Sequence, residues 1–168
     1  MEYKKINDIC SYLPKSNIKA GSGTKKGSYP FFTSSNKQIL YIDEFLYDDE
    51  ALIFGTGGSA SCNYYKGKFA TSTDNIVVKS NKINLRYLYY FFRNNDMKIL
   101  QDGFHGVGLN HISKAYFGNI EVPIVEKSKQ EEVVSILDNL NVLLLKCEAQ
   151  LKNLDELIKS RFIGQEDY

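Results

Sequence analysis

Short runs of apolar residues, separated by turn-forming residues, fill the first 125 residues of the chain. Aromatic and β-branched residues gather in brief segments bounded by Gly, Asn, Ser and Asp, which is the pattern of short strands linked by turns. The predicted strands are residues 29–33, 39–42, 51–55, 61–66, 75–79 and 119–123. Residues 64–69 are predicted to form a hairpin that turns at Gly67.

One segment of this body has helical spacing. Leu85, Leu88, Tyr89 and Phe92 follow the i, i+3, i+4, i+7 pattern behind Asn84, a residue type that caps helix N-termini. We therefore expect a single helix here, with one aromatic-rich face packed on the body.

The pattern changes after Pro123, which ends the last predicted strand. Ser128 and Glu131 have the spacing of a capping box, and from there to about residue 162 the chain has no Gly or Pro. Apolar residues recur with a heptad period along this segment, although Gln150 occupies one seam position. The apolar stripe consists of Val133, Ile136, Leu137, Leu140, Leu143, Leu144, Cys147, Leu151, Leu154, Leu157 and Ile158.

A helix of about 33 residues would be ~50 Å long, longer than a small domain is wide. We therefore expect it to project and to pack its stripe against another helix, from a second copy or a partner. The alternative is a core helix folded back onto the same domain. The predicted fold class is α+β: a mixed β-rich domain over residues 1–125, a long coiled-coil-type helix over residues 126–164, and a tail over residues 165–168.

Composition and charge show what core the chain can form and which partners its surface suits. With 168 residues, 43% of them hydrophobic, the chain can bury a core without disulfides or metals. The net charge is +1, but residues 1–120 carry an excess of +5 and residues 121–168 an excess of −4. This division suits a phosphate-facing body and a protein-facing tail, although ordinary surface scatter also produces it.

Cysteine and histidine usage predicts no metal site and no disulfide. Cys10, Cys62 and Cys147 are odd in number and far apart, so free thiols are expected. His105 and His111 lack the spacing of a metal motif. No run of 18 apolar residues occurs, and the N-terminal residues are too charged for a signal peptide, so we expect a soluble cytoplasmic protein.

No catalytic constellation stands out. Gly55-Thr56-Gly57-Gly58 superficially resembles a loop that binds S-adenosylmethionine, but the segment after it looks extended, so a tight turn is predicted. The chain lacks the Asp/Asn-Pro-Pro-aromatic signature of amino-methyltransferases. The carboxylates Asp48, Asp49 and Glu50 lack a following carboxylate-x-lysine pair and are interpreted as a solvated turn. We expect binding rather than catalysis.

Several segments, in order along nearly the whole chain, resemble the specificity subunits of type I restriction-modification systems. They are Lys4-Lys5-Ile6-Asn7-Asp8-Ile9, Tyr29-Pro30, the glycine turn at residues 55–58, Gly67-Lys68-Phe69, Thr73-Asp74-Asn75, residues 106–112, Pro123 followed by Gln130, and Leu157-Ile158-Lys159. Glu126-Lys127 departs from the family by enlarging a junction that is usually apolar.

The resemblance implies one target-recognition domain and one conserved helix, where a usual member has two of each. The chain is then a half-subunit or a fragment. The implied partners are double-stranded DNA, methyltransferase subunits and a second copy through the long helix, and the resemblance leaves open whether a nuclease subunit joins them. The subunit itself is implied to be non-catalytic and to need no cofactor, with S-adenosylmethionine on the methyltransferase.

Polar loops are the expected sites of base and phosphate contact, because Asn and Gln can pair with adenine and Lys with guanine. The candidates are Lys25, Lys26, Ser34, Ser35, Asn36, Lys37, Gln101, His105, Asn110, His111 and Lys114. Solvated turns would also explain such loops. The rival function is a β-rich interaction or glycan-binding module on a coiled-coil stalk, which suits the abundance of tyrosine and phenylalanine.

Overall fold

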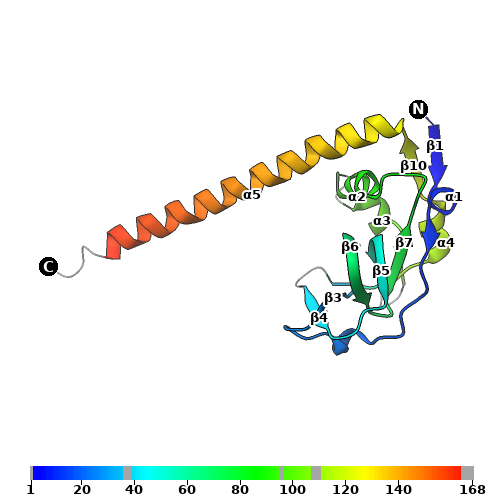
Figure 1. The fold of residues 1–168 in the computed structure, drawn as a ribbon, viewed down its shortest axis with the longest axis horizontal. Coiled ribbons are helices and arrows are strands. Elements are labelled where there is room, and N and C mark those ends of the chain that lie inside the picture. The colour runs from blue at the N-terminus through cyan, green and yellow to red at the C-terminus, as the bar shows by residue number, and fades with distance from the viewer. Residues whose placement is uncertain (1, 36–38, 95–96, 107–110, 164–168) are drawn as a thin grey trace. The chain divides into compact units, whose positions relative to one another are not determined.

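The computed structural model describes residues 2–35, 39–94, 97–106 and 111–163 (Figure 1). Its contacts divide the chain into two compact units, Met1–Glu131 and Glu132–Tyr168. The first unit is a mixed α/β domain and the second continues a long helix. The predicted α+β class, a β-rich domain followed by a long helix, is confirmed.

The described elements alternate between short strands and short helices before the long C-terminal helix begins. The strands are β1 (Glu2–Lys5), β2 (Ser11–Tyr12), β3 (Tyr29–Phe32), β4 (Leu40–Ile42), β5 (Tyr47–Gly55), β6 (Ser61–Thr71), β7 (Asn75–Lys79), β8 (Phe104–His105), β9 (His111–Ile112) and β10 (Glu121–Ile124). The helices are α1 (Ile6–Ile9), the 3₁₀ turn η1 (Ala20–Ser22), α2 (Leu85–Asn94), α3 (Lys98–Gln101), α4 (Lys114–Asn119) and α5 (Lys127–Ile163).

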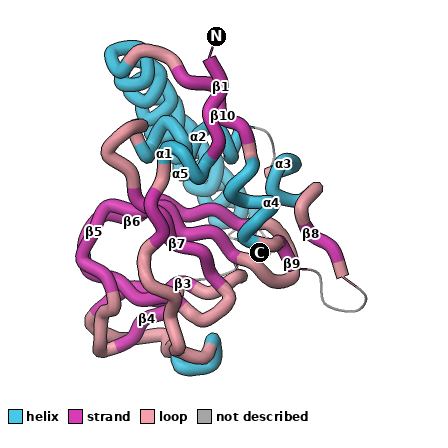
Figure 2. The backbone as a smooth tube through the Cα atoms, turned by 90° about the vertical axis from the view of Figure 1, so that its right-hand side faces the viewer, coloured by secondary structure: helices cyan, strands magenta, loops and turns pink. Residues whose placement is uncertain are grey.

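A six-stranded sheet forms the centre of the first unit, with the strand order β2-β7-β5-β6-β3-β4. Neighbouring strands are antiparallel except β3 and β6, which run parallel through the pairs Phe31↔Ala70 and Phe32↔Thr71. The antiparallel pairs β1–β10 and β8–β9 lie outside this sheet (Figure 2).

Both faces of the sheet are covered. Successive side chains of β5 point to opposite faces, so Leu52 and Phe54 share one face while Ala51 and Ile53 share the other. All four are at most 1% exposed. The Phe54 ring packs against Phe92 of α2 and Phe117 of α4, at centroid distances of 5.0 and 4.7 Å. Burial on both sides explains the unbroken apolar run in β5.

The hairpin predicted at Gly67 is wrong, because β6 continues through this residue and pairs it with Asp49. Gly67 has a φ of +126°, which glycine adopts readily and other residues rarely do. The strand is also bent. Thr71 pairs with Phe32, yet Ser34, two residues further on, accepts a hydrogen bond from Ser61 at the opposite end of β6.

A straight strand would hold the two ends of β6 roughly 33 Å apart. The bend instead lets the sheet curl. Phe69 lies on the second face because it is paired with Tyr47, which shares that face with Ala51 and Ile53. Phe69 packs there with Tyr47 and Phe32, at centroid distances of 5.0 and 5.9 Å. The curled sheet thus supplies its own second layer.

Helix α2 matches its prediction. Asn84 caps it, because its Oδ1 accepts hydrogen bonds from the main-chain nitrogens of Arg86 and Tyr87 at 2.9 and 3.2 Å. Leu85, Leu88 and Phe92 are buried, and Tyr89 is partly buried. The expectation of a single helix in the body is wrong, however. Helices α1, α3 and α4 have only four to six residues, too few to show a helical period in the sequence.

The strand predicted at residues 119–123 begins later than expected. Asn119 ends α4, and β10 starts at Glu121. Helix α4 forms because Ser113 caps it, its Oγ accepting a hydrogen bond from Tyr116 N at 3.1 Å.

Gln130 fastens the first turn of α5 to the domain. Its Oε1 accepts a hydrogen bond from Asn84 N at 2.9 Å, and its Nε2 donates to Val125 O at 2.8 Å. The predicted cap at Ser128 is wrong. Gln130 N donates to Glu126 O at 3.0 Å, so the first helical bond closes before Ser128, which lies inside α5.

Helix α5 has 37 residues and is about 55 Å long. The predicted long helix is confirmed. Along it, Val133 and Leu137 are half-buried, Cys147 is exposed, and the other members of the predicted stripe are 48–64% exposed. No helix within the described ranges has both the length and the hydropathy of a transmembrane span.

Candidate nucleic-acid interface

The glycine-rich segment forms a tight turn between β5 and β6, as predicted. We call residues 56–60 the β5–β6 turn. It joins two antiparallel strands, so the strand-loop-helix context of a cofactor-binding loop is replaced by a hairpin. Gly58 has a φ of +82°, which explains glycine at this position. Gly58 and Ser59 are exposed at its tip.

Three of the predicted binding residues converge on this turn. The Oε1 atom of Gln101 accepts a hydrogen bond from Ala60 N at 3.1 Å. The Nδ1 atom of His111 lies 3.1 Å from Thr56 O, a contact that needs a proton on Nδ1. The carbonyl oxygen of Ser34 accepts a hydrogen bond from the Oγ of Ser61 at 3.3 Å. The loops after β3, around α3 and before α4 therefore meet at one place.

These side chains bind the main chain, a role that the sequence prediction did not include. The Oγ of Ser34 also donates to Asp74 O at 2.7 Å, which ties the loop after β3 to the turn between β6 and β7. Gln101 and His111 bind main-chain groups of the β5–β6 turn, and the Ser34 hydroxyl binds a carbonyl of the turn before β7, so these side chains hold the shape of the interface. Contact with bases stays a prediction for them.

Gly55 allows the close approach of these loops. A Cβ atom at this position would lie 2.8 Å from the carbonyl oxygen of Ser34 and even closer to the hydroxyl of Ser61. The main chain of Ser34 therefore packs directly on the end of β5, and any larger residue at position 55 would displace it.

Other predicted residues lie apart from this cluster or outside the described chain. Lys25 and Lys26 are exposed on the loop before β3, where Thr24 pairs with Tyr41 of the edge strand β4. Ser35 and His105 are exposed, and His105 pairs with His111 across β8 and β9. Asn36, Lys37 and Asn110 lie outside the described residues.

Beside the turn lies a cleft of about 300 Å³, which we call the lysine cleft. Its polar side chains include Lys15, Thr56, Thr73 and Lys114, and its apolar walls include Leu13, Pro14, Ile76, Val77 and Ile112. Lys114 was predicted, whereas Lys15 was missed because a single lysine after a proline has no distinguishing pattern.

Asn75 is a second residue whose role the spacing of the sequence did not show. It is 6% exposed, and its Nδ2 donates to Phe32 O at 3.2 Å and to the Oγ of Ser72 at 2.9 Å. It therefore braces β3 against the turn that leads into β7. The resemblance of Thr73-Asp74-Asn75 to a family segment was the one signal that marked it.

The acidic cluster does not lie in a solvated turn, because Asp48, Asp49 and Glu50 belong to β5. Asp49 pairs with Lys79 at 3.1 Å, and Glu50 with Lys66 at 3.4 Å. These carboxylates are thus balanced by lysines of the neighbouring strands, six or more residues before the β5–β6 turn.

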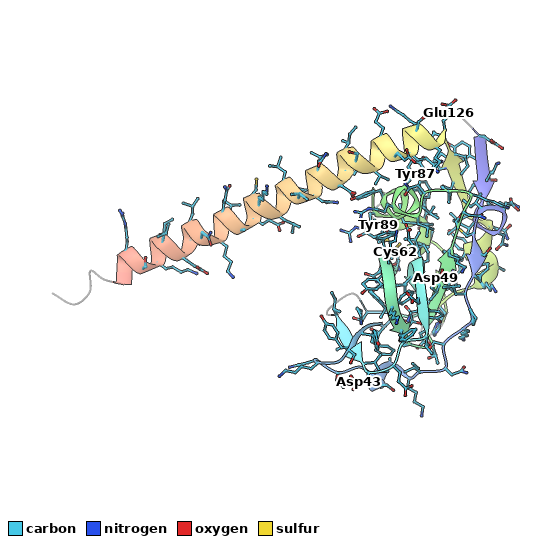
Figure 3. All side chains as sticks on the ribbon, in the orientation of Figure 1. Asp43, Asp49, Cys62, Tyr87, Tyr89 and Glu126 are labelled. Carbon is cyan, nitrogen blue, oxygen red and sulfur yellow. The ribbon has the colours of Figure 1, made fainter. Side chains whose placement is uncertain are left out.

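The buried thiols are poorly suited to nucleophilic chemistry. Burial raises the pKa of Cys10 to about 12. Burial also raises the pKa of Cys62, which lies on the face of the sheet that α2 covers (Figure 3). Both stay protonated near neutral pH, and the thiolate is the reactive form. Within the described ranges, no three His, Cys, Asp or Glu side chains are grouped as metal ligands would be.

Comparison with protein families decides what kind of chain this is. A family described as the type I restriction modification DNA specificity domain matches residues 1–155. The chain belongs to this family. The resemblance noted in the sequence is thereby confirmed, and the match favours a specificity domain over an interaction module on a stalk.

Two curated relatives carry the same family description in their names. The chain is 27% identical over 147 residues to the type I restriction enzyme EcoDI specificity subunit of Escherichia coli, covering 88% of this chain and 33% of the relative. It is 28% identical over 151 residues to the putative specificity subunit S.HindORF215P of Haemophilus influenzae, covering 85% and 38%. The chain thus spans little more than a third of the length of these relatives.

Solved structures agree on the fold. The S subunit of a type I restriction-modification system from M. genitalium superposes with a TM-score of 0.71 and 17% identity, covering 94% of this chain and 41% of that one. The HsdS subunit from Thermoanaerobacter tengcongensis gives 0.61 and 14%, covering 95% and 44%. At these identities, the likeness supports the specificity-domain fold and not individual contacts.

Proposed function

We propose that the first unit of this chain recognises double-stranded DNA, and that it reads one half of a bipartite site for a type I restriction-modification system. Membership of the specificity-domain family carries the proposal. The convergence of polar loops around the β5–β6 turn supports it, since reading base edges requires exposed side chains on a rigid support.

The chain acts without catalysis of its own. Its buried cysteines are protonated, and Asp49 and Glu50 of β5 are paired with lysines. We assign methyl transfer to a methyltransferase subunit that carries S-adenosylmethionine. A nuclease subunit can join the same assembly. We place this activity in the cytoplasm.

Helix α5 provides the docking element for partners. The exposed side chains of its stripe, such as Leu140 and Leu143, are 48% and 57% exposed. An apolar stripe of this length is stabilised when a second helix covers it. We propose that a second copy or the methyltransferase supplies that helix. With two identical copies, the two half-sites would be inverted repeats, because a two-fold protein axis imposes a two-fold site.

Methylation mapping tests this function. The chain is co-expressed with its methyltransferase in cells that lack other adenine methylation, and modified bases are mapped across the genome. A bipartite methylated motif that disappears when the chain is omitted is the expected result. Methylation that is absent, or that has the same pattern without the chain, would overturn the proposal.

A further inference from the structure

The lysine cleft has the composition of an anion site. It is formed by the segment after β2, the β5–β6 turn, the start of β7 and the start of α4, and none of its described lining residues carries a carboxylate. Asp74 is exposed next to Thr73 but does not line the cleft. Threonine hydroxyls can donate hydrogen bonds to an anion that two ammonium groups attract.

The two lysines of the cleft differ from Lys66 of β6 and Lys79 of β7. Lys66 and Lys79 pair with carboxylates at 3.4 and 3.1 Å. Within the described residues, neither Lys15 nor Lys114 has a carboxylate within ion-pair distance. Their charges are therefore available to a ligand, and the apolar walls beside them strengthen the local field.

Lys114 is held in place rather than mobile in solvent. Its Nζ lies 4.0 Å from the centre of the Tyr12 ring. That ring is fixed in turn, because the hydroxyl of Tyr12 donates to the Oδ1 of Asn7 at 2.8 Å and the ring packs edge-on against Phe117 at 6.2 Å. A cation over an aromatic face is attracted by the electron density of the ring. The ammonium group is thus pre-positioned at the mouth of the cleft.

Resting on the proposed function, we infer that the lysine cleft binds a backbone phosphate of the DNA duplex. Lys15 and Lys114 supply the charge, and Thr56 links the site to the β5–β6 turn, whose exposed tip faces the bases. The cleft sets the register of the duplex, and the turn beside it carries the sequence-dependent contacts. Lys114 accordingly anchors phosphate and does not read guanine.

Salt dependence of DNA binding distinguishes these roles. The complex of the chain with its methyltransferase is titrated with a duplex that carries the methylated motif and with a random duplex, over a range of salt concentrations. The slope of log Kobs against log salt is negative, and it becomes less steep by about 0.9 for each phosphate contact that is lost. In the double variant Lys15→Ala with Lys114→Ala, we expect the slope to become less steep by about 0.9 or more, which corresponds to the loss of at least one phosphate contact. The change is expected to be equal on both duplexes.

Two further variants complete the test. Lys66→Ala with Lys79→Ala removes the same charge from β6 and β7 and is expected to leave the slope unchanged. Lys15→Arg with Lys114→Arg is expected to retain the wild-type slope. Thermal melting checks that each variant is folded.

The outcomes separate this inference from the proposed function. If the wild-type complex binds both duplexes but the cleft variant keeps the wild-type slope, the inference is overturned and DNA recognition stands. If the cleft variant loses binding to the specific duplex only, Lys15 or Lys114 reads bases and the phosphate assignment is wrong. If the wild-type complex does not bind the specific duplex, both claims fail.

Discussion

Gln130 joins three parts of the first unit through one buried amide. It connects the start of α2, the chain after β10 and the first turn of α5, and it is 3% exposed. Glutamine fits because its amide both accepts and donates, and both atoms are used here.

Replacing Gln130 by alanine leaves Asn84 N without an acceptor and Val125 O without a donor. Both groups are partly buried, so we expect the free energy of unfolding to fall by about 1–2 kcal/mol, the lower part of the range for an unsatisfied buried polar group. Urea titration followed by circular dichroism measures this change. Glu131→Ala, at the neighbouring exposed position, serves as the control and is expected to change stability by less. Equal stability of Gln130→Ala and wild type would show that the amide does not fasten the joint.

At the scale of elements, the sequence predicted those features whose cause is local. Turn residues, capping and periodicity predicted the strand cores at β3, β5 and β7, the helix α2 with its cap at Asn84, and the long helix α5. The bend in β6 did not, because Gly67 looks like a hairpin turn until its pairing with Asp49 is known. Short helices such as α4 were also missed, because six residues are too few to show a helical period even though Ser113 caps the helix.

The sequence predicted which residue types would lie in the candidate interface, whereas their arrangement became clear only from the tertiary contacts. Ser34, Gln101 and His111 were expected in polar loops, but their convergence on the β5–β6 turn joins residues up to 55 positions apart. Lys15 and Asn75 were missed for the same reason. A lysine after Pro14 gains meaning only when the fold places it beside Lys114.

The stripe of α5 makes an element-scale prediction. Leu140→Lys with Leu143→Lys places two charges in the seam, where covering by another helix would bury them at high cost. We expect the variant to lose self-association or co-purification with the methyltransferase, as measured by light scattering and affinity capture. Ser135→Lys with Ala149→Lys adds the same charge outside the predicted stripe and is expected to assemble normally. Unchanged assembly of the seam variant would show that the stripe does not bind a partner.

At the scale of the whole molecule, burial of neutral acids makes stability depend on pH. The pKa of Cys10 is raised to about 12, and burial also raises the pKa values of Cys62, Tyr12, Tyr47 and Tyr87. In the unfolded chain these groups lose their protons first, at pH values near 9 for thiols and 10 for phenols. The unfolded state then binds fewer protons than the native state, so stability falls as pH rises.

We therefore expect the free energy of unfolding to be constant near neutral pH and to decrease steadily above about pH 9. Urea titrations in reducing buffer between pH 7 and 11 measure this profile. Cys10→Ala removes one of the titrating groups, so its decrease is expected to be shallower. A flat profile up to pH 11 would contradict the burial of these neutral forms.

The fastening of the β5–β6 turn has a consequence for how such domains diversify. The side chains that hold the turn bind its main-chain atoms Thr56 O and Ala60 N, and Gly55 N at the end of β5. Every amino acid apart from proline supplies these same groups, so the side chains at the tip can be exchanged while the supporting bonds persist. Substitutions at the tip can then change the DNA sequence that the domain prefers while the fold stays the same.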